Sequence, residues 1–249
     1  MDQLRLTTLS PVTITSYATI DSTNTAAKRL IGNTQLKTPV AIVADEQTAG
    51  YGRHGRPYFS PDQVGVYLTL IWPVADSRTL NPGQVTTSVA VAAATALSVE
   101  LGVQVGIKWV NDLYYQHKKV AGILVESVGN HLIIGIGLNI NPTDYPVDIQ
   151  AKAGALTDQQ VDREQLVASL LNYFVRYFSL DARDVMRDYR KLSLVIGQQV
   201  ELVVGKQTIQ GRVQDVLDDG GLFVQTDTGQ QTFYSGEITK LNMTGWTIS

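Results

Sequence analysis

A loop rich in glycine and arginine is the stretch of the sequence whose residue types most directly suggest chemistry. Residues 49–58 read AGYGRHGRPY, in which the glycines have the spacing G-x-G-x-x-G and are interleaved with Arg53 and Arg56. Glycines let backbone N–H groups approach a ligand closely, and guanidinium groups bind carboxylates and phosphates in a bidentate manner. The loop therefore indicates a site for an anionic ligand. The alternative is an ordinary loop with solvated arginines.

The glycine spacing does not by itself identify a nucleotide-binding motif. A dinucleotide fingerprint needs a helix that begins at the last glycine, whereas Pro57, Pro61 and a strand-like run over residues 64–70 follow this loop. The run before it, residues 40–44, also has the composition of a strand. The Gly-Lys-Ser/Thr ending of a Walker loop is absent from the sequence, as are the H-R-D and D-F-G motifs of kinases. We therefore predict a strand–loop–strand unit.

Polar side chains also interrupt three consecutive, mostly apolar segments in the middle of the chain. Residues 105–115, 119–128 and 132–140 have the composition of strands with short connections, which predicts an antiparallel meander. Charged and amide side chains inside such strands are costly unless they are paired. The alternative is that each lies on a solvated strand face. The candidates for one shared polar site are Lys108, Asp112, Lys119, Glu126 and Asn139.

A further polar group precedes a helix near the N-terminus. After a strand-like segment at residues 12–17, the sequence DSTN at 21–24 leads into a helical run. Ser22 or Thr23 is a natural N-cap of this helix, and Gly32 is a natural end for it. These side chains serve either as caps alone or, with the free N–H groups of the first turn, as partners of a polar ligand.

The remaining segments indicate the elements that must hold these groups in place. A helix from Pro82 to about Leu101, ended by Gly102, is apolar on nearly all sides in its middle, as expected of a helix buried against a sheet. Two more helices are expected, one beginning at Asp162 and one over residues 181–191. The fold class is therefore α+β, with a mixed, largely antiparallel sheet packed by helices.

The pattern changes after Gly197. Short alternating segments are separated by turn signals rich in aspartate and glycine, which indicates a small β-barrel. We therefore expect two domains, 1–194 and 195–249. The expected strands of the second domain are 199–204, 208–216, 222–225 and 232–234.

Composition excludes several classes of function. The chain has 249 residues and a formal net charge of −3, without the basic excess typical of nucleic-acid-binding proteins. It has no cysteine, which excludes disulfides, cysteine nucleophiles and thiolate zinc sites. The N-terminus shows no secretory signal, and the longest apolar stretch, residues 89–99, is short for a membrane span. We expect a soluble, cytoplasmic protein that contacts neither DNA nor a membrane.

Four blocks of the sequence stand in a fixed order. They are DSTN at 21–24, QTAGYGRHGR at 47–56, KWVND at 108–112 continued by KVAGILVE at 119–126, and GIGLNIN at 135–141. With these blocks in order, the chain resembles the biotin–protein ligase family, also called biotin–[acetyl-CoA-carboxylase] ligases. Each block is modestly specific, but four in the family's order are highly specific. The resemblance implies a class II synthetase-like, biotin–lipoate ligase-like catalytic domain with a C-terminal SH3-like barrel.

The resemblance implies a two-step reaction. Biotin and ATP give biotinoyl-adenylate and pyrophosphate, and a lysine of a biotin carboxyl carrier domain then takes the biotinoyl group. Charge stabilisation and positioning carry such chemistry, so it needs no protein nucleophile. This agrees with the absence of cysteine and of a Ser-His-Asp pattern. The cofactors implied are ATP and Mg²⁺, with biotin as substrate.

The resemblance also implies roles for single residues, with Lys119 and Arg53 as the catalytic residues. Those implied to bind biotin are Ser22, Thr23, Asn24, Gln47, Gly50, Tyr51, Gly52, Arg53, Lys119 and Gly122. Those implied to bind ATP are Arg53, Arg56, Tyr58, Lys108, Asn111, Asp112 and Asn139, with Asp112 also implied as the Mg²⁺ ligand.

Three positions depart from the family's pattern. Tyr51 replaces the usual arginine, Tyr58 the usual tryptophan and Val110 the usual proline. A tyrosine can still stack on adenine, but losing an arginine should weaken the grip on an adenylate. Two alternatives therefore stay open: a lipoate- or octanoate-type acyl ligase or transferase on the same fold, and a non-catalytic protein that binds biotin or the carrier.

The family's repressor-type members carry an N-terminal helix-turn-helix domain. Only about fifteen residues precede the matched region here, which is too few for such a domain. We therefore expect a ligase without a DNA-binding role, acting as a monomer or a homodimer.

Overall fold

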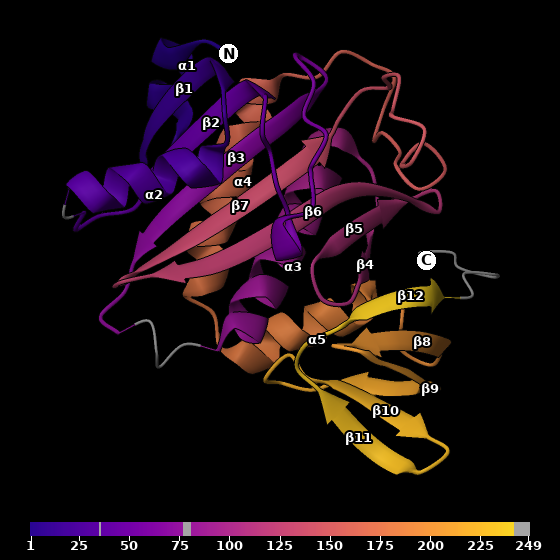
Figure 1. The fold of residues 1–249 in the computed structure, drawn as a ribbon. Helices are drawn as coiled ribbons and strands as arrows, with labels where there is room; N and C mark the ends of the chain where they lie inside the picture. The colour runs from indigo at the N-terminus through magenta and orange to yellow at the C-terminus, as the bar shows by residue number, and fades with distance from the viewer. Residues whose placement is uncertain (35, 77–80, 242–249) are drawn as a thin grey trace.

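The computed structural model describes residues 1–34, 36–76 and 81–241, and its largest element is a seven-stranded sheet (Figure 1). The strand order is β1-β2-β3-β7-β6-β5-β4, with β1 and β2 parallel and every other pair antiparallel. The mixed, largely antiparallel sheet and the predicted meander are both confirmed, but the single strand expected over residues 105–115 is wrong, because a turn at 109–111 divides it into two antiparallel strands. The strands are β1 (Thr13–Ile20), β2 (Val40–Gln47), β3 (Gly65–Pro73), β4 (Gly106–Lys108), β5 (Asp112–Tyr115), β6 (Lys118–Val128) and β7 (His131–Asn139).

Helices cover both faces of this sheet. Helix α2 contacts β2, β3 and β7 on one face, and α3 and α4 contact β6 and β3 on the other (Figure 1). Alternation along β3 explains the division, because Val66, Leu68 and Leu70 belong to the α3–α4 core while Ile71 packs with α2. The helices are α1 (Gln3–Leu9), α2 (Thr23–Asn33), α3 (Pro82–Leu101), α4 (Arg163–Phe178) and α5 (Ala182–Leu192).

The ends of most helices follow the capping signals. Ser22, Asp162 and Asp181 are N-caps whose side chains accept backbone N–H groups, and Gly102 ends α3 in the left-handed conformation, with φ 66°. The prediction that Gly32 ends the first long helix is wrong, because α2 continues to Asn33 and Thr34 is its C-cap. Helix α1, a short element before β1, was not predicted.

Helix α3 is the most apolar helix among the described residues. It is the one described helix long and apolar enough to cross a bilayer, yet its residues from Val89 to Leu97 are mostly buried against α4, α5 and the sheet. The helix is longer than the apolar stretch seen in the sequence, and it is the core helix of a soluble globular protein.

A second sheet follows α5, with five antiparallel strands in the order β11-β10-β9-β8-β12. Four of them correspond to the predicted segments, and β12 was not predicted. Below, the C-terminal sheet means these strands and their turns. They are β8 (Gln199–Val204), β9 (Gln207–Val216), β10 (Leu222–Thr226), β11 (Gly229–Phe233) and β12 (Glu237–Leu241).

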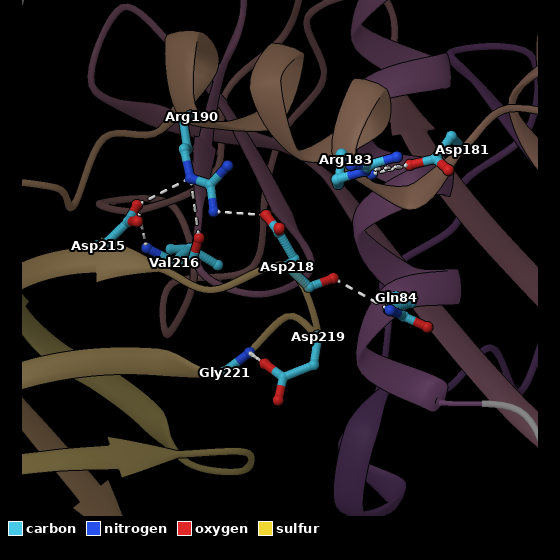
Figure 2. A network of polar contacts seen from close by, with 9 residues as sticks. All are labelled: Gln84, Asp181, Arg183, Arg190, Asp215, Val216, Asp218, Asp219 and Gly221. Atoms are coloured by element: carbon cyan, nitrogen blue, oxygen red, sulfur yellow. Dashed lines mark hydrogen bonds and ion pairs between the residues drawn. The ribbon is translucent and has the colours of Figure 1, made fainter.

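The turn between β9 and β10 joins the C-terminal sheet to the helices (Figure 2). Arg190 of α5 donates to Asp215, to Asp218 and to the backbone carbonyl of Val216, at 2.8 to 3.1 Å. On the other side of the turn, Trp109 Nε1 donates to Gly220 O at 3.0 Å in a buried position. The two sheets therefore share a directional, hydrogen-bonded junction.

This junction predicts a specific loss of stability. Arg190→Ala should lower the free energy of unfolding by about 1–2 kcal/mol, because it leaves one carbonyl and two carboxylates without their charged donor. Chemical denaturation measures the change. The matched control is Arg183→Ala, since the Arg183 side chain is exposed and contacts Asp181 of its own helix (Figure 2). An equal effect of the two substitutions would contradict the prediction.

Candidate functional site

A cavity with two lobes lies on the α2 face of the seven-stranded sheet. The smaller lobe has a volume of about 220 Å³ and lies beneath the glycine–arginine loop, and the larger has about 490 Å³ and extends toward the C-terminal sheet. The lobes share six residues, which are Arg56, Pro57, Tyr58, Asp112, Lys119 and Glu237. Every residue to which the family resemblance gives a role lines one lobe or both, except Gly50. Gly50 packs so closely against Ser60 and the Tyr58 carbonyl that a Cβ would lie 2.8 Å from each.

The closed end of the smaller lobe is polar, and we call it the polar end. Thr23 and Asn24, in the first turn of α2, are almost fully buried there. Gln47 Oε1 accepts from the backbone N–H of Thr23 at 2.9 Å, and its Nε2 donates to Ser60 Oγ at 2.9 Å. Gly135 of β7 makes room for Asn24, because a Cβ there would lie 2.3 Å from Asn24 Oδ1. The α2 N-terminus thus lies against the sheet with its polar side chains fixed.

Glu126 of β6 lies beside this end and ties the loop to it. Its carboxylate accepts from Tyr51 Oη at 3.0 Å, from Asn24 Nδ2 at 3.2 Å and from Lys28 Nζ at 2.8 Å. Lys28 Nζ also lies 5.3 Å from the centre of the Tyr51 ring. Tyr51, at the position where an arginine was expected, therefore holds the loop through a carboxylate and a cation. Of the five candidates for one shared polar site, Glu126 is the one that does not line the cavity.

The Tyr51 contact predicts a faster release of ligand when it is lost. Tyr51→Phe should speed dissociation of a ligand from beneath the loop about tenfold, because a hydrogen bond to a charged acceptor is removed. Stopped-flow displacement measures the rate. Tyr17→Phe is the control, since Tyr17 lies exposed on β1. Unchanged release from the Tyr51 variant would mean that other contacts close the loop.

A lysine–carboxylate pair occupies the junction of the two lobes. Lys119 Nζ lies 2.7 Å from Asp112 Oδ1 as an ion pair rather than an aligned hydrogen bond. Burial lowers the pKa of Lys108, a shift that the nearby Asp112 opposes. Asn111 donates from Nδ2 to the Ile123 carbonyl, which leaves its Oδ1 facing Arg53 Nη1 at 3.4 Å. Cations therefore surround one carboxylate at this junction.

Tyr58 forms a wall between the lobes. Its hydroxyl donates to the Gly137 carbonyl at 2.8 Å, and burial raises its pKa well above the ordinary value. A Cβ at Gly137 would lie 2.4 Å from the ring, so the ring lies directly on the β7 backbone. Asn139 faces the larger lobe, and its Nδ2 donates to the Gly154 carbonyl at 3.1 Å. This leaves an aromatic side chain and an amide at the larger lobe.

The C-terminal sheet completes the cavity through contacts of single residues that no sequence motif predicted. Glu237 pairs with Arg56 at 2.6 and 2.9 Å, and Arg53 Nη1 donates to the Gly236 carbonyl at 3.3 Å. The hydrogen bond from Arg56 lowers the pKa of Glu237. No motif links Glu237 to a loop 181 residues earlier. Both arginines of the loop are thus oriented by the second sheet.

Comparison with known proteins agrees with this architecture. The model of the biotin/lipoate A/B protein ligase family matches residues 16–140, and that of the biotin protein ligase C terminal domain matches residues 195–241. The chain is similar to the biotin protein ligase from Aquifex aeolicus solved in complex with biotin and ATP. The TM-score is 0.80 and the identity 27%, covering 91% of this chain and 97% of that one.

Curated relatives agree in sequence. The bifunctional ligase/repressor BirA of Bacillus subtilis is 30% identical over 233 residues, which is 88% of this chain and 71% of that protein. The biotin--[acetyl-CoA-carboxylase] ligase of Mycobacterium tuberculosis is 28% identical over 218 residues, covering 81% of this chain and 79% of that protein. The chain therefore belongs to the biotin/lipoate A/B protein ligase family, and within it to the biotin–protein ligases.

Proposed function

We propose that the smaller lobe binds biotin and the larger lobe binds ATP. The ureido ring then occupies the polar end, beside Ser22, Thr23, Asn24 and Gln47, under the loop segment from Gly50 to Gly52. The carboxylate points to Arg53 and Lys119 over Gly122. One observation carries this assignment: the two lobes meet at Lys119 and Asp112, so ligands in both would meet beside a lysine.

The proposed chemistry has two steps. A carboxylate oxygen of biotin attacks the α-phosphorus of ATP, the bond from that phosphorus to the bridging oxygen breaks, and pyrophosphate leaves. A lysine amine of the carrier then attacks the carbonyl carbon, AMP leaves with the bonding pair, and the amine loses a proton. Both steps develop negative charge on phosphate oxygens, so preorganised cations are the catalytic groups.

Individual side chains divide this work. Lys119 and Arg53 stabilise charge on the carboxylate and the α-phosphate, and Arg56 turns from Glu237 to the phosphates when ATP binds. Lys108 adds a further cation to the nucleotide lobe. Tyr58 provides the surface on which adenine stacks, and Asn139 binds its edge through the amide.

The residues present fit a magnesium ion that enters with ATP. Mg²⁺ in nucleotide sites needs only one or two carboxylates, because phosphates and water complete its shell. Asp112 Oδ1 is buried with Lys119 as its ion-pair partner, and it would become a ligand once Lys119 turns to the carboxylate and the α-phosphate, with Asn111 beside it. The ion would neutralise phosphate charge.

The proposed partner is a biotin carboxyl carrier domain of a biotin-dependent carboxylase. The name of the Mycobacterium tuberculosis relative, a biotin--[acetyl-CoA-carboxylase] ligase, supports this partner. We further propose two domains, 1–194 and 195–249, a cytoplasmic protein, and a monomer or homodimer without a DNA-binding role. The net charge of −3 supports the last point.

Mass measurement of a carrier domain tests the proposed function. Incubation with the protein, biotin, ATP and Mg²⁺ should add one biotinoyl group to the carrier. Omission of ATP should abolish the addition. An unmodified carrier in the complete mixture would overturn the proposal.

A further inference from the structure

A network of hydrogen bonds runs beneath the polar end and includes Glu126, which also holds the loop, and Thr69, which has had no role so far. Thr69 Oγ1 lies 2.6 Å from Asn24 Oδ1 and 2.8 Å from Thr23 Oγ1, and Asn24 Nδ2 lies 3.2 Å from Glu126 Oε2. Thr23 and Asn24 line the cavity, whereas Thr69 is fully buried behind them on β3. This hydrogen-bond network thus connects the Glu126 carboxylate to the Thr23 hydroxyl, which lines the cavity.

Glu126 decides the direction of these hydrogen bonds. A carboxylate next to the Lys28 ammonium, 2.8 Å away, only accepts hydrogen bonds, so the nitrogen of the Asn24 amide must face it. The Asn24 oxygen must then face Thr69. Because an amide oxygen also only accepts, Thr69 has to donate its single hydroxyl proton to Asn24.

The proton of Thr23 is fixed in turn. Thr69 has no second proton, so their 2.8 Å contact is a hydrogen bond only if Thr23 donates. The other acceptor within reach of the Thr23 hydroxyl is Gln47 Oε1, at 3.1 Å. Gln47 Oε1 already accepts the Thr23 backbone N–H, and donation to it would leave the 2.8 Å contact of the two hydroxyls without a hydrogen, so the Thr23 proton points to Thr69. The remaining lone pairs of Thr23 Oγ1 are then left for the cavity.

We propose that Glu126 and Thr69 are positioning residues that set the hydrogen-bond polarity of the biotin site. Acting through Asn24, they hold the Thr23 hydroxyl as an acceptor for a ureido N–H group. The inference rests on the proposed placement of the ureido ring at the polar end. If Thr23 turned its proton toward a ligand acceptor, its oxygen and that of Thr69 would face each other at 2.8 Å without a hydrogen.

Two near-isosteric analogues of biotin test this polarity. In each, one ureido N–H is replaced by a ring oxygen, so that a donor becomes an acceptor. Calorimetry should show that the unmodified protein binds at least one analogue about 30-fold or more weakly than biotin, because the site then faces an unmatched acceptor. The measured quantity is the ratio of the Kd for that analogue to the Kd for biotin.

Substitutions in this hydrogen-bond network should reduce the ratio of the analogue Kd to the biotin Kd. Thr69→Val removes the hydroxyl oxygen to which Thr23 donates its proton. Glu126→Gln introduces an N–H donor opposite Asn24, so the Asn24 amide can turn over. Each should lower the ratio about tenfold. Thr69→Ser, which retains the hydroxyl, should rescue it. Thr87→Val is the matched control, since Thr87 is a fully buried threonine on α3 that donates to the Gln84 carbonyl.

The results separate a polarity role from a structural one. Thermal melting shows whether each variant is folded, and Glu126→Gln and Thr69→Val give independent readings. Weaker binding of biotin and analogue by the same factor in both variants would overturn the proposal. So would an unmodified protein that biotinylates the carrier yet binds both analogues as well as biotin. Failure of that protein to biotinylate the carrier would overturn the proposed function, and this inference with it.

Discussion

Adenylation should strongly favour biotin over octanoate or lipoate, by a factor on the order of 10⁴–10⁵. The polar end presents Thr23, Asn24 and Gln47 in nearly fixed orientations. These groups already have partners in the protein, but an alkyl acid would leave the lone pairs and N–H groups that they turn to the cavity unmatched, and each buried unpaired polar group costs about 1–3 kcal/mol. Pyrophosphate release with each acid at matched concentrations measures the preference.

A variant of Gln47 separates the polar pocket from general loss of activity. Gln47→Leu removes the amide that accepts from the Thr23 backbone and donates to Ser60. The preference should shrink mainly because activity with biotin falls. Comparable activity of the unmodified protein with octanoate would move it to the lipoate-type class. Absence of activity with every acid would favour the non-catalytic alternative.

Lys119→Ala should slow adenylation by about 10²–10³-fold, the usual effect of losing one preorganised charge contact in an active site. Lys119 lies where the two lobes meet, and its ammonium is held 2.7 Å from Asp112. The side chain is about one-third exposed, so its removal should change folding little. Pyrophosphate release with biotin and ATP measures the rate.

The neighbouring lysine is the control for this substitution. Lys118 Nζ donates to the Ala151 carbonyl at 2.6 Å, and its side chain packs against Gly154 rather than into either lobe. Lys118→Ala should therefore retain most of the rate. A Lys119 variant within a few-fold of the unmodified protein would remove this lysine from the mechanism.

Local patterns predicted most of the fold. Three mostly apolar segments predicted the meander, although the first of them forms both β4 and β5, and Ser22, Asp162 and Asp181 marked the starts of α2, α4 and α5. Helix α1 was not predicted because it has only seven residues, and Leu6 is its one buried side chain. Its stability comes from tertiary packing, which no local propensity reports.

The site was predictable where it lies on neighbouring elements and not elsewhere. Thr23, Gln47, Arg53 and Lys119 share one cavity because their elements pack on one face of the sheet. The prediction that Glu126 and Asp112 belong to one shared polar site did not separate the two ends of the cavity. Glu126 and Lys119 are seven positions apart on β6, roughly 23 Å along an extended strand. Glu126 therefore lies beside the polar end of the smaller lobe, and Lys119 lies where the two lobes meet. Glu237 carries no local signal, because its contact depends on the docking of a second sheet.

The Gly236–Glu237 contact has a consequence for synthesis of the protein. Arg53 and Arg56 receive these partners from residues 183 and 181 positions further along the chain. A nascent chain that has already folded its seven-stranded sheet on the ribosome still lacks one wall of the nucleotide lobe. The enzyme therefore becomes complete only when β12 leaves the exit tunnel, which separates the time of folding from the time of activation.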